Sequence, residues 1–230
     1  MLKLVIGNKA YSSWSLRPWV YLKHLGIPFE EVRVPLYQGD YKAAITRYNP
    51  AGKVPVLVDG GTTVWDSLAI LEYLAERQPA PPDGGGWPAE PKARAMARSV
   101  SAEMHSGFGA MRENLCMNVR KTYPWRPAGS ANAWPEAVLA DVARIQALWE
   151  DCRKLAAALF GESGGGPFLF GPFSAADAMY APVAWRFAGY SVPLTPTARA
   201  YVDTLLALPA MREWQAGAMA ESEVLPQYDR

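Results

Sequence analysis

The segment Asn49–Asp59 constrains the fold more than any other stretch of this chain, because Pro55 stands at the start of an apolar run. Proline cannot donate a hydrogen bond to a neighbouring strand, so a strand that begins Val54-Pro55-Val56 must be an edge, a bulge or a special turn. A turn with a cis peptide bond before Pro55 would leave the backbone of Val54 free to hold a peptide as an added strand. From these residues alone, an edge strand interrupted by proline is an equally good interpretation.

Composition excludes several classes of protein. The chain has 230 residues, of which half are hydrophobic and 12% aromatic, and its net charge is +1. This length allows one large domain or two small ones around a packed core. A nearly neutral chain without blocks of like charge argues against a nucleic-acid partner. No apolar run is long enough for a membrane helix, and the N-terminal run is too short for a signal peptide. We therefore expect a cytoplasmic protein.

The cysteine and histidine content argues against a metal site. Cys116 and Cys152 are the two cysteines, and both lie in stretches of helical pattern far from any Cys-x-x-Cys spacing. A disulfide framework or a zinc site is therefore not expected. His24 and His105 are too few for a site built from several histidines. We expect a protein without a metal cofactor.

The hydrophobic pattern divides the chain into two units. Residues 1–80 alternate short apolar strands with amphipathic helices in the order βαβαββα, and residues 81–91 have the proline and glycine content of a linker. Residues 92–230 carry helical periodicity almost throughout. The expected strands are 2–6, 29–35, 54–58 and 62–65, and the expected helices are 15–25, 41–48, 67–77, 92–121, 134–160, 175–187 and 196–218. The sequence predicts an α/β domain followed by an all-helical domain.

A serine cluster, Ser12, Ser13 and Ser15, stands where the first predicted helix begins. Serine hydroxyls often cap the free N–H groups of a helix, which would account for the cluster by itself. The same position also suits an anion, because a helix N-terminus carries partial positive charge. A hydroxyl there can donate a hydrogen bond to a thiolate and lower the thiol pKa from the roughly 8.5 of free cysteine. A serine-protease arrangement is excluded, since neither a His–Asp pair nor a Gly-x-Ser-x-Gly turn accompanies the serines.

Four motifs in order resemble the cytosolic glutathione transferases over essentially the full length of the chain. Residues 12–17 are similar to the Ser-Ser-Cys-x-x-Arg signature of zeta-type and related serine-dependent bacterial members, and residues 49–55 to the cis-proline segment of the family. Asp66-Ser67 is similar to the family's (Glu/Gln)-Ser pair. Phe170–Asp177 matches the buried capping box and hydrophobic staple of the helical domain. The resemblance implies a thioredoxin-like N-terminal domain, an all-helical C-terminal domain and a homodimer.

The resemblance also implies a site for glutathione as co-substrate. Ser12 would hydrogen-bond the glutathione thiolate, with Ser13 as the alternative, whereas Arg17 is expected in a structural ion pair below the first helix. Pro55 would present the backbone of Val54 to the cysteinyl residue of glutathione.

Three further residues would hold the two ends of glutathione. Ser67 would bind the γ-glutamyl carboxylate at a helix N-terminus. Asp66 would bind the γ-glutamyl ammonium with a side chain one methylene shorter than the usual Glu. Lys53 is a candidate partner for the glycyl carboxylate, and a solvated surface lysine is the alternative.

The second substrate would lie against the first long helix of the helical domain, where the resemblance places the acceptor pocket. Phe108 and Met111, with Trp125, are candidates for an apolar floor, and His105 and Arg112 for polar contacts. Taken singly, each aromatic side chain here is more typical of the core than of a pocket. Ser174 and Asp177, by contrast, are expected to act in folding as a helix cap worth on the order of 1 kcal/mol.

The leading hypothesis is a glutathione S-transferase that conjugates the thiolate to small hydrophobic electrophiles. A maleylacetoacetate isomerase-like enzyme using glutathione is the first alternative, although Trp14 replaces the cysteine of that signature. A non-catalytic binding module with the same fold is the second. Serine rather than cysteine at the head of the first helix argues against thiol–disulfide exchange through a protein thiol.

Overall fold

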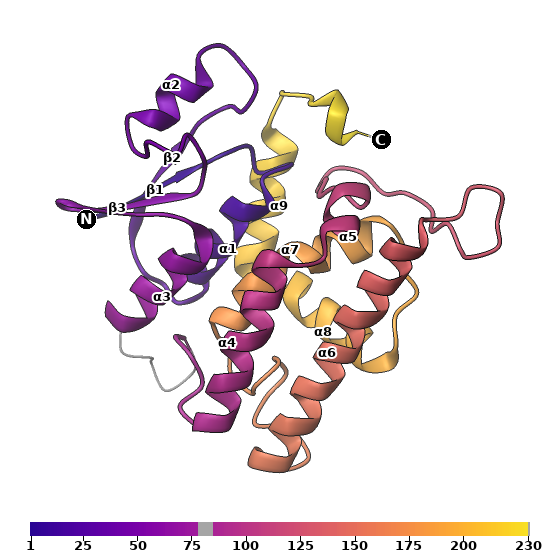
Figure 1. Ribbon diagram of the computed structural model, residues 1–230. Coiled ribbons are helices and arrows are strands. Elements are labelled where there is room, and N and C mark those ends of the chain that lie inside the picture. Colours follow the sequence, from indigo (N-terminus) through magenta and orange to yellow (C-terminus); the bar gives the residue numbers. More distant parts are fainter. Residues whose placement is uncertain (78–84, 230) are drawn as a thin grey trace.

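The computed structural model describes residues 1–77 and 85–229, which form an α/β unit and a helical unit packed side by side (Figure 1). The α/β unit follows the predicted order, β1 (Leu2–Ile6), α1 (Ser13–His24), β2 (Phe29–Arg33), α2 (Tyr41–Thr46), β3 (Val56–Asp59), β4 (Thr62–Val64) and α3 (Ser67–Arg77). The predicted βαβαββα arrangement is confirmed.

The four strands form one mixed sheet in the order β2-β1-β3-β4. Strand β1 pairs parallel to β2 and antiparallel to β3, and β4 pairs antiparallel to β3. Because side chains alternate across a strand, Leu4 and Leu57 face the main core with α1 and α3, whereas Val5 and Val56 face α2 on the other side. The sheet is therefore covered by helices on both faces.

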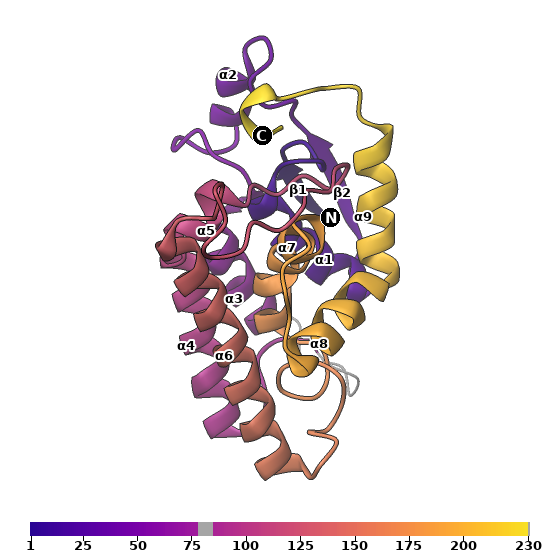
Figure 2. The same cartoon turned by 90° about the vertical axis from the view of Figure 1, so that its right-hand side faces the viewer.

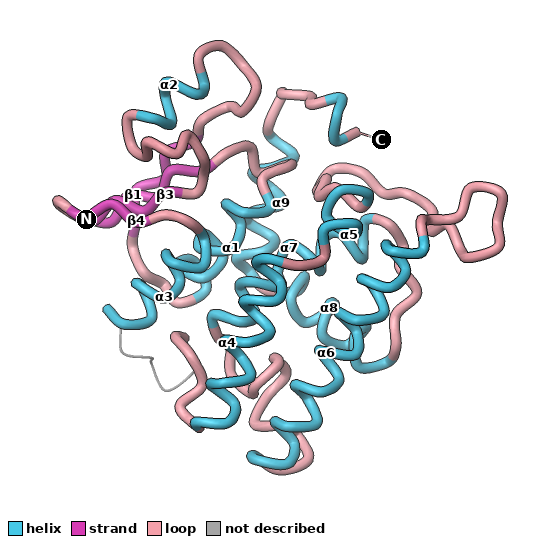
Figure 3. The backbone as a smooth tube through the Cα atoms, in the orientation of Figure 1, coloured by secondary structure: helices cyan, strands magenta, loops and turns pink. Residues whose placement is uncertain are grey.

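The helical unit is built around α7 (Ala175–Gly189). This helix is apolar on nearly every side, and such a helix belongs in the interior. It packs against α1, α4 (Pro91–Ser106) and α8 (Pro196–Ala207), while α6 (Glu136–Phe160) packs on α4, α5 (Gly109–Asn114) and α8 (Figure 3). No helix among the described residues is both long and apolar enough to cross a bilayer.

Two predicted helices are each broken in the structure. The helix predicted over 92–121 ends at Ser106 and resumes as α5 (Gly109–Asn114), with Phe108 between them in the left-handed region at φ 55°. The helix predicted over 196–218 divides into α8 and α9 (Pro209–Ala220), because Pro209 has no N–H to continue the ladder. Cys116 consequently lies in a loop after α5 and not in a helix, as the pattern had indicated.

The predicted linker 81–91 lies partly outside the described residues. From Gly85 onward it is attached to both units. Gly85 N donates to Phe173 O (2.7 Å), and Gly86 N donates to the hydroxyl of Tyr21 in α1 (2.7 Å). These two backbone N–H groups are therefore bonded within the protein, whereas those of a free linker would be solvated.

Residues 221–229, called the C-terminal strap below, return from α9 to the α/β unit and end in a short 3-10 helix, Pro226–Tyr228 (Figure 2). The Glu221 carboxylate accepts from Lys9 N (2.6 Å) and Ala10 N (2.9 Å). Arg120 donates to Glu221 O (2.8 Å) and Glu223 O (2.7 Å). The periodicity did not predict this segment, because its contacts are made by single polar groups.

The capping box at the start of α7 is confirmed. The buried Asp177 carboxylate accepts from Ser174 N (2.8 Å), from the Ser174 hydroxyl (2.8 Å), from Leu169 N (3.1 Å) and from the Tyr201 hydroxyl (2.9 Å). These four donors satisfy a carboxylate that has no access to water. The pair has a folding role, as expected.

Candidate active site

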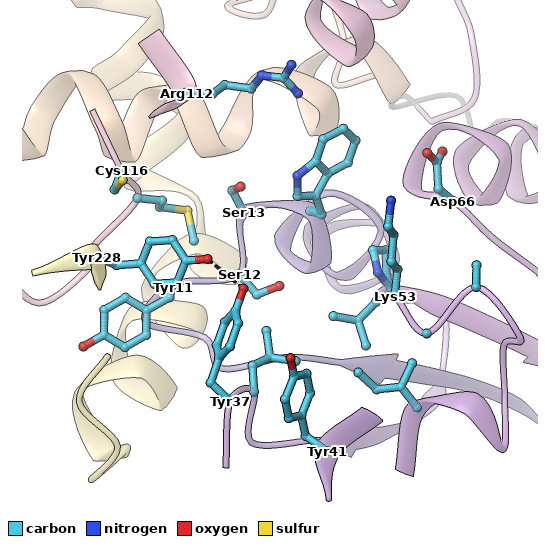
Figure 4. Close-up of a pocket in the computed structure, with 18 of the residues that line it drawn as sticks. Tyr11, Ser12, Ser13, Tyr37, Tyr41, Lys53, Asp66, Arg112, Cys116 and Tyr228 are labelled. Carbon is cyan, nitrogen blue, oxygen red and sulfur yellow. Dashed lines mark hydrogen bonds between the residues drawn. The ribbon is translucent and has the colours of Figure 1, made fainter. Parts of the chain in front are cut away.

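A cleft of about 820 Å³ opens between the two units, at the head of α1 (Figure 4). Its walls come from the loop before α1, the loop before β3, the end of α5 and the C-terminal strap. Seven of the residues singled out in the sequence line it, namely Ser12, Ser13, Lys53, Val54, Pro55, Asp66 and Arg112. The fold therefore brings together groups that are up to 100 positions apart in the sequence.

The Val54–Pro55 peptide bond is cis, so the special-turn interpretation is confirmed over an ordinary edge strand. Strand β3 begins only at Val56, and the backbone of Val54 makes no hydrogen bond to another described residue. The loop before it is held by the buried Asn49, whose Nδ2 donates to Lys53 O (3.1 Å). The Val54 backbone groups thus remain available at the wall of the cleft.

The serines do not cap the helix through their side chains. Ser12 is the N-cap residue of α1, yet its hydroxyl caps no N–H group and donates instead to Ser15 Oγ (2.8 Å). Ser13 Oγ accepts a hydrogen bond from Arg186 Nη2 (3.1 Å). Both Ser12 and Ser13 are mostly buried, and both line the cleft. Helix capping is therefore not the reason for the cluster.

Cationic side chains gather behind the serines. Arg17 is fully buried, donates to Ser67 Oγ (3.1 Å) and stacks on the ring of Trp14 at 4.2 Å. Burial, and then the charges of Arg186 and Arg112, lower the pKa of Arg17 to about 9. Burial lowers the pKa of Arg186 to about 10, so both remain cationic at neutral pH. The ion pair expected for Arg17 is not formed with any carboxylate of the described residues, since its partner is a hydroxyl.

Five of the expected site residues do not line the cleft, among them Trp125, which packs against the main core. Phe108 and Met111, expected as the floor of an acceptor pocket, are buried in the main core, because the break after α4 turns them inward. Ser67, the first residue of α3, is fully buried next to Arg17. His105 Nε2 lies 3.2 Å from the Asp66 carboxylate, so this histidine contacts the α/β unit beside the cleft. The floor therefore has a different composition from the one predicted.

The other half of the cleft consists of residues that sequence reasoning missed. They are mainly tyrosines and sulfur-containing side chains, Tyr11, Tyr37, Tyr41, Cys116, Met117 and Tyr228 (Figure 4). These residues come from four separate segments and share no spacing, so no sequence signal could have grouped them. Arg186 was also missed, because it stands in an otherwise apolar helical run.

No group of three or more histidine, cysteine or acidic side chains within residues 1–77 and 85–229 is arranged to hold a metal ion. At the head of α1, the cleft presents serine hydroxyls with buried cationic side chains behind them. This arrangement stabilises an anion placed at the head of α1.

Comparison with known proteins defines the class. The family model described as the glutathione S-transferase N-terminal domain matches residues 11–77, and the model of the glutathione S-transferase C-terminal domain matches residues 130–215. The chain belongs to the glutathione S-transferase family. Its α/β unit and its helical unit are the two domains of that fold.

Individual relatives match parts of the chain. A probable maleylacetoacetate isomerase of Caenorhabditis elegans is 38% identical over 42% of this chain and 42% of its own length. Glutathione S-transferase theta-1 of Mus musculus is 36% identical over 39% of this chain and 37% of its own length. The matched region thus spans less than half of these relatives. A Burkholderia glutathione transferase homologue, crystallised with bound glutathione, has the same fold with a TM-score of 0.63 and 24% identity, covering 96% of this chain and 99% of that one.

Proposed function

We propose that this protein is a glutathione transferase that adds the glutathione thiolate to small hydrophobic electrophiles. The observation that carries the proposal is a shared cleft. Free backbone groups at Val54 and serine hydroxyls at the head of α1 line the same cavity. An extended peptide paired with Val54 would have its cysteinyl sulfur directed to the serines. Holding both substrates in one cleft supplies the proximity that the reaction needs.

The ends of glutathione have charged partners available. Lys53 is exposed at the cleft and pairs with no carboxylate of the described residues, which suits the glycyl carboxylate. The Asp66 carboxylate accepts from Leu68 N (3.1 Å) and is held beside His105, which suits the γ-glutamyl ammonium. Ser67 is buried beside Arg17 and does not line the cleft, so we assign it no contact with the γ-glutamyl carboxylate.

The proposed chemistry is nucleophilic attack by sulfur. A hydrogen bond from serine and the positive charge of the buried arginines favour the thiolate over the thiol. The thiolate electron pair forms the new bond to carbon. In a substitution, the leaving group departs with the electron pair of the bond that breaks. In an addition to a double bond, the resulting carbanion instead takes up a proton. The tyrosine-lined half of the cleft would hold the electrophile beside the sulfur.

The test is binding and turnover measured together. Calorimetry with glutathione should detect binding, and Lys53→Met should weaken it several-fold by removing the partner of one carboxylate. A chlorinated aromatic acceptor should be conjugated with release of chloride. Absence of both binding and conjugation would favour the non-catalytic module, and binding without conjugation of several acceptors would argue against a transferase.

An isomerase activity is the second candidate. Arg112 and Arg186 line the cleft, and cationic side chains suit a substrate that carries carboxylates. The relative from Caenorhabditis elegans is named a probable maleylacetoacetate isomerase. Trp14 in place of a cysteine argues against it. Turnover of maleylacetone, compared with the chlorinated aromatic acceptor, separates the two activities.

We also propose a cytoplasmic homodimer, on the family resemblance. Light scattering at several protein concentrations tests the assembly. A mass equal to one chain at every concentration would contradict it.

A further inference from the structure

We propose that Ser13, and not Ser12, donates the hydrogen bond to the glutathione thiolate, and that Arg186 positions Ser13 for this role. The inference rests on the proposed function, since it takes the sulfur of glutathione to lie in the cleft at the head of α1. It reverses the assignment that the sequence resemblance implied. The two serines differ in where each hydroxyl proton is directed.

The proton of Ser12 is already engaged. Ser12 Oγ donates to Ser15 Oγ at 2.8 Å, and Ser15 Oγ accepts a second hydrogen bond from Gly7 N at 3.1 Å. A hydroxyl carries a single proton, so the Ser12 oxygen can offer only lone pairs to the cleft. Lone pairs repel a thiolate. For Ser12 to serve the sulfur, its proton would have to turn from Ser15 Oγ toward the cleft.

The proton of Ser13 is free. Ser13 Oγ accepts from Arg186 Nη2 at 3.1 Å, and no acceptor for its own proton lies within hydrogen-bond distance among the described side chains and backbone groups. Ser13 lines the cleft, so a thiolate there would take this proton as a hydrogen bond. A hydroxyl that accepts from a cation is a stronger donor, because the two bonds polarise the same oxygen.

Arg186 brings a charge that the described residues do not neutralise. Arg186 as a whole is 6% exposed, and its guanidinium donates to Arg112 O (3.1 Å), to Leu115 O and to Ser13 Oγ, all of which are uncharged. A buried cation without a carboxylate partner is costly, and an anion in the adjacent cleft would reduce that cost. The guanidinium also fixes the rotamer of Ser13 by joining α7 to the head of α1.

The other charged groups around the cleft are mixed in sign. The cations are Arg17 behind α1, Arg112 on α5 and Lys53 before β3, and the anions are Asp66 before α3 and Glu113 on α5. Both carboxylates lie at the wall and neither is hydrogen-bonded to a serine hydroxyl. The groups that touch Ser13 are therefore cationic or neutral, which favours a thiolate at that point.

The experiment compares the thiol pKa of bound glutathione, read from thiolate absorbance, in the wild type and in Ser12→Ala, Ser13→Ala, Ser13→Thr and Arg186→Lys. Ser13→Ala should raise the thiol pKa of bound glutathione by about one unit or more. At a pH below the thiol pKa of both the wild type and the variant, the thiolate fraction then falls about tenfold. The kcat should fall accordingly while the KM for glutathione changes little. Ser13→Thr keeps the hydroxyl and should restore most of the effect, and Ser12→Ala should shift the pKa several-fold less than Ser13→Ala does.

Arg186→Lys should also raise the thiol pKa, with the pH–rate profile displaced toward higher pH. Because Arg186 supports two backbone carbonyls as well, circular dichroism must show that this variant folds. If it does not fold, the two alanine variants still decide the question, since neither removes a backbone contact of Arg186. A larger pKa increase in Ser12→Ala than in Ser13→Ala would overturn the inference and leave the proposed function intact. A wild type that does not bind glutathione would instead remove the proposed function itself.

Discussion

The hydroxyl groups of Tyr37 and Tyr228, 191 positions apart in the sequence, share a hydrogen bond of 2.9 Å (Figure 4). Tyr37 stands in the loop after β2 with a left-handed backbone at φ 60°, and Tyr228 lies in the last turn of the C-terminal strap. Both rings line the cleft. The strap therefore completes the wall on the side opposite Lys53, and the proposed electrophile site depends on its attachment.

Arg120 is the main anchor of the strap. Arg120→Met removes donors to two strap carbonyls and to the Tyr11 hydroxyl, leaving partly buried acceptors unpaired. We expect a loss of about 1–3 kcal/mol in the free energy of unfolding of the strap and faster cleavage of the C-terminus in limited proteolysis. Arg126→Met is the matched control, because Arg126 is exposed and only lies over the Trp134 ring. Equal proteolysis of both variants would contradict the anchoring role.

Asp177 supports the fold at the start of α7. Asp177→Ala leaves four buried donors without an acceptor, so we expect a loss of about 3 kcal/mol or more in the free energy of unfolding. Urea denaturation followed by fluorescence measures it. Asp203→Ala, on the exposed face of α8, should change stability by less than about 0.5 kcal/mol. Comparable losses in the two variants would show that the buried network is not the cause.

His24 should make stability depend on pH. Its ring packs 4.2 Å from that of Phe173, and burial lowers the pKa of His24 below its usual value near 6.5. The unfolded chain then binds more protons than the folded one as pH falls through about 6.5, so acidification destabilises the fold until the lower, folded pKa is passed. Denaturation midpoints at about pH 7.5 and about pH 5 should differ less in His24→Phe than in the wild type. An unchanged difference would refute the assignment to His24.

The two cysteines should differ in reactivity. Cys116 lines the cleft, whereas Cys152 is completely buried in α6 and burial, followed by the charge of Asp177, raises the pKa of its thiol. A disulfide reagent should therefore modify Cys116 in the native protein and both cysteines after denaturation. Cys116→Ser should abolish the native reaction, and Cys152→Ala should leave it in place. Protection of Cys116 by glutathione would further support a shared cleft, and rapid native modification of Cys152 would contradict the prediction.

The two-unit architecture and part of the site were predictable, because they depend on local patterns. Alternating and helical periodicities and the Ser174–Asp177 cap all act over a few residues. The Val54–Pro55 turn belongs to this group, since a proline at the start of a strand restricts the backbone directly. The breaks at Phe108 and Pro209 were missed because the apolar spacing continues across both.

The sequence by itself determined where strands, helices and the head of α1 would lie, and hence that two serines would stand near a free backbone turn. Only the tertiary structure decided how the two hydroxyls are bonded, because Arg186 donates to Ser13 Oγ from 173 positions away, whereas Ser12 donates its hydroxyl proton in a hydrogen bond to Ser15 Oγ. It also decided that the strap, rather than Phe108 and Met111, lines the far half of the cleft. Local patterns specify elements, whereas hydrogen-bond partners and cavity walls are set by how distant elements pack.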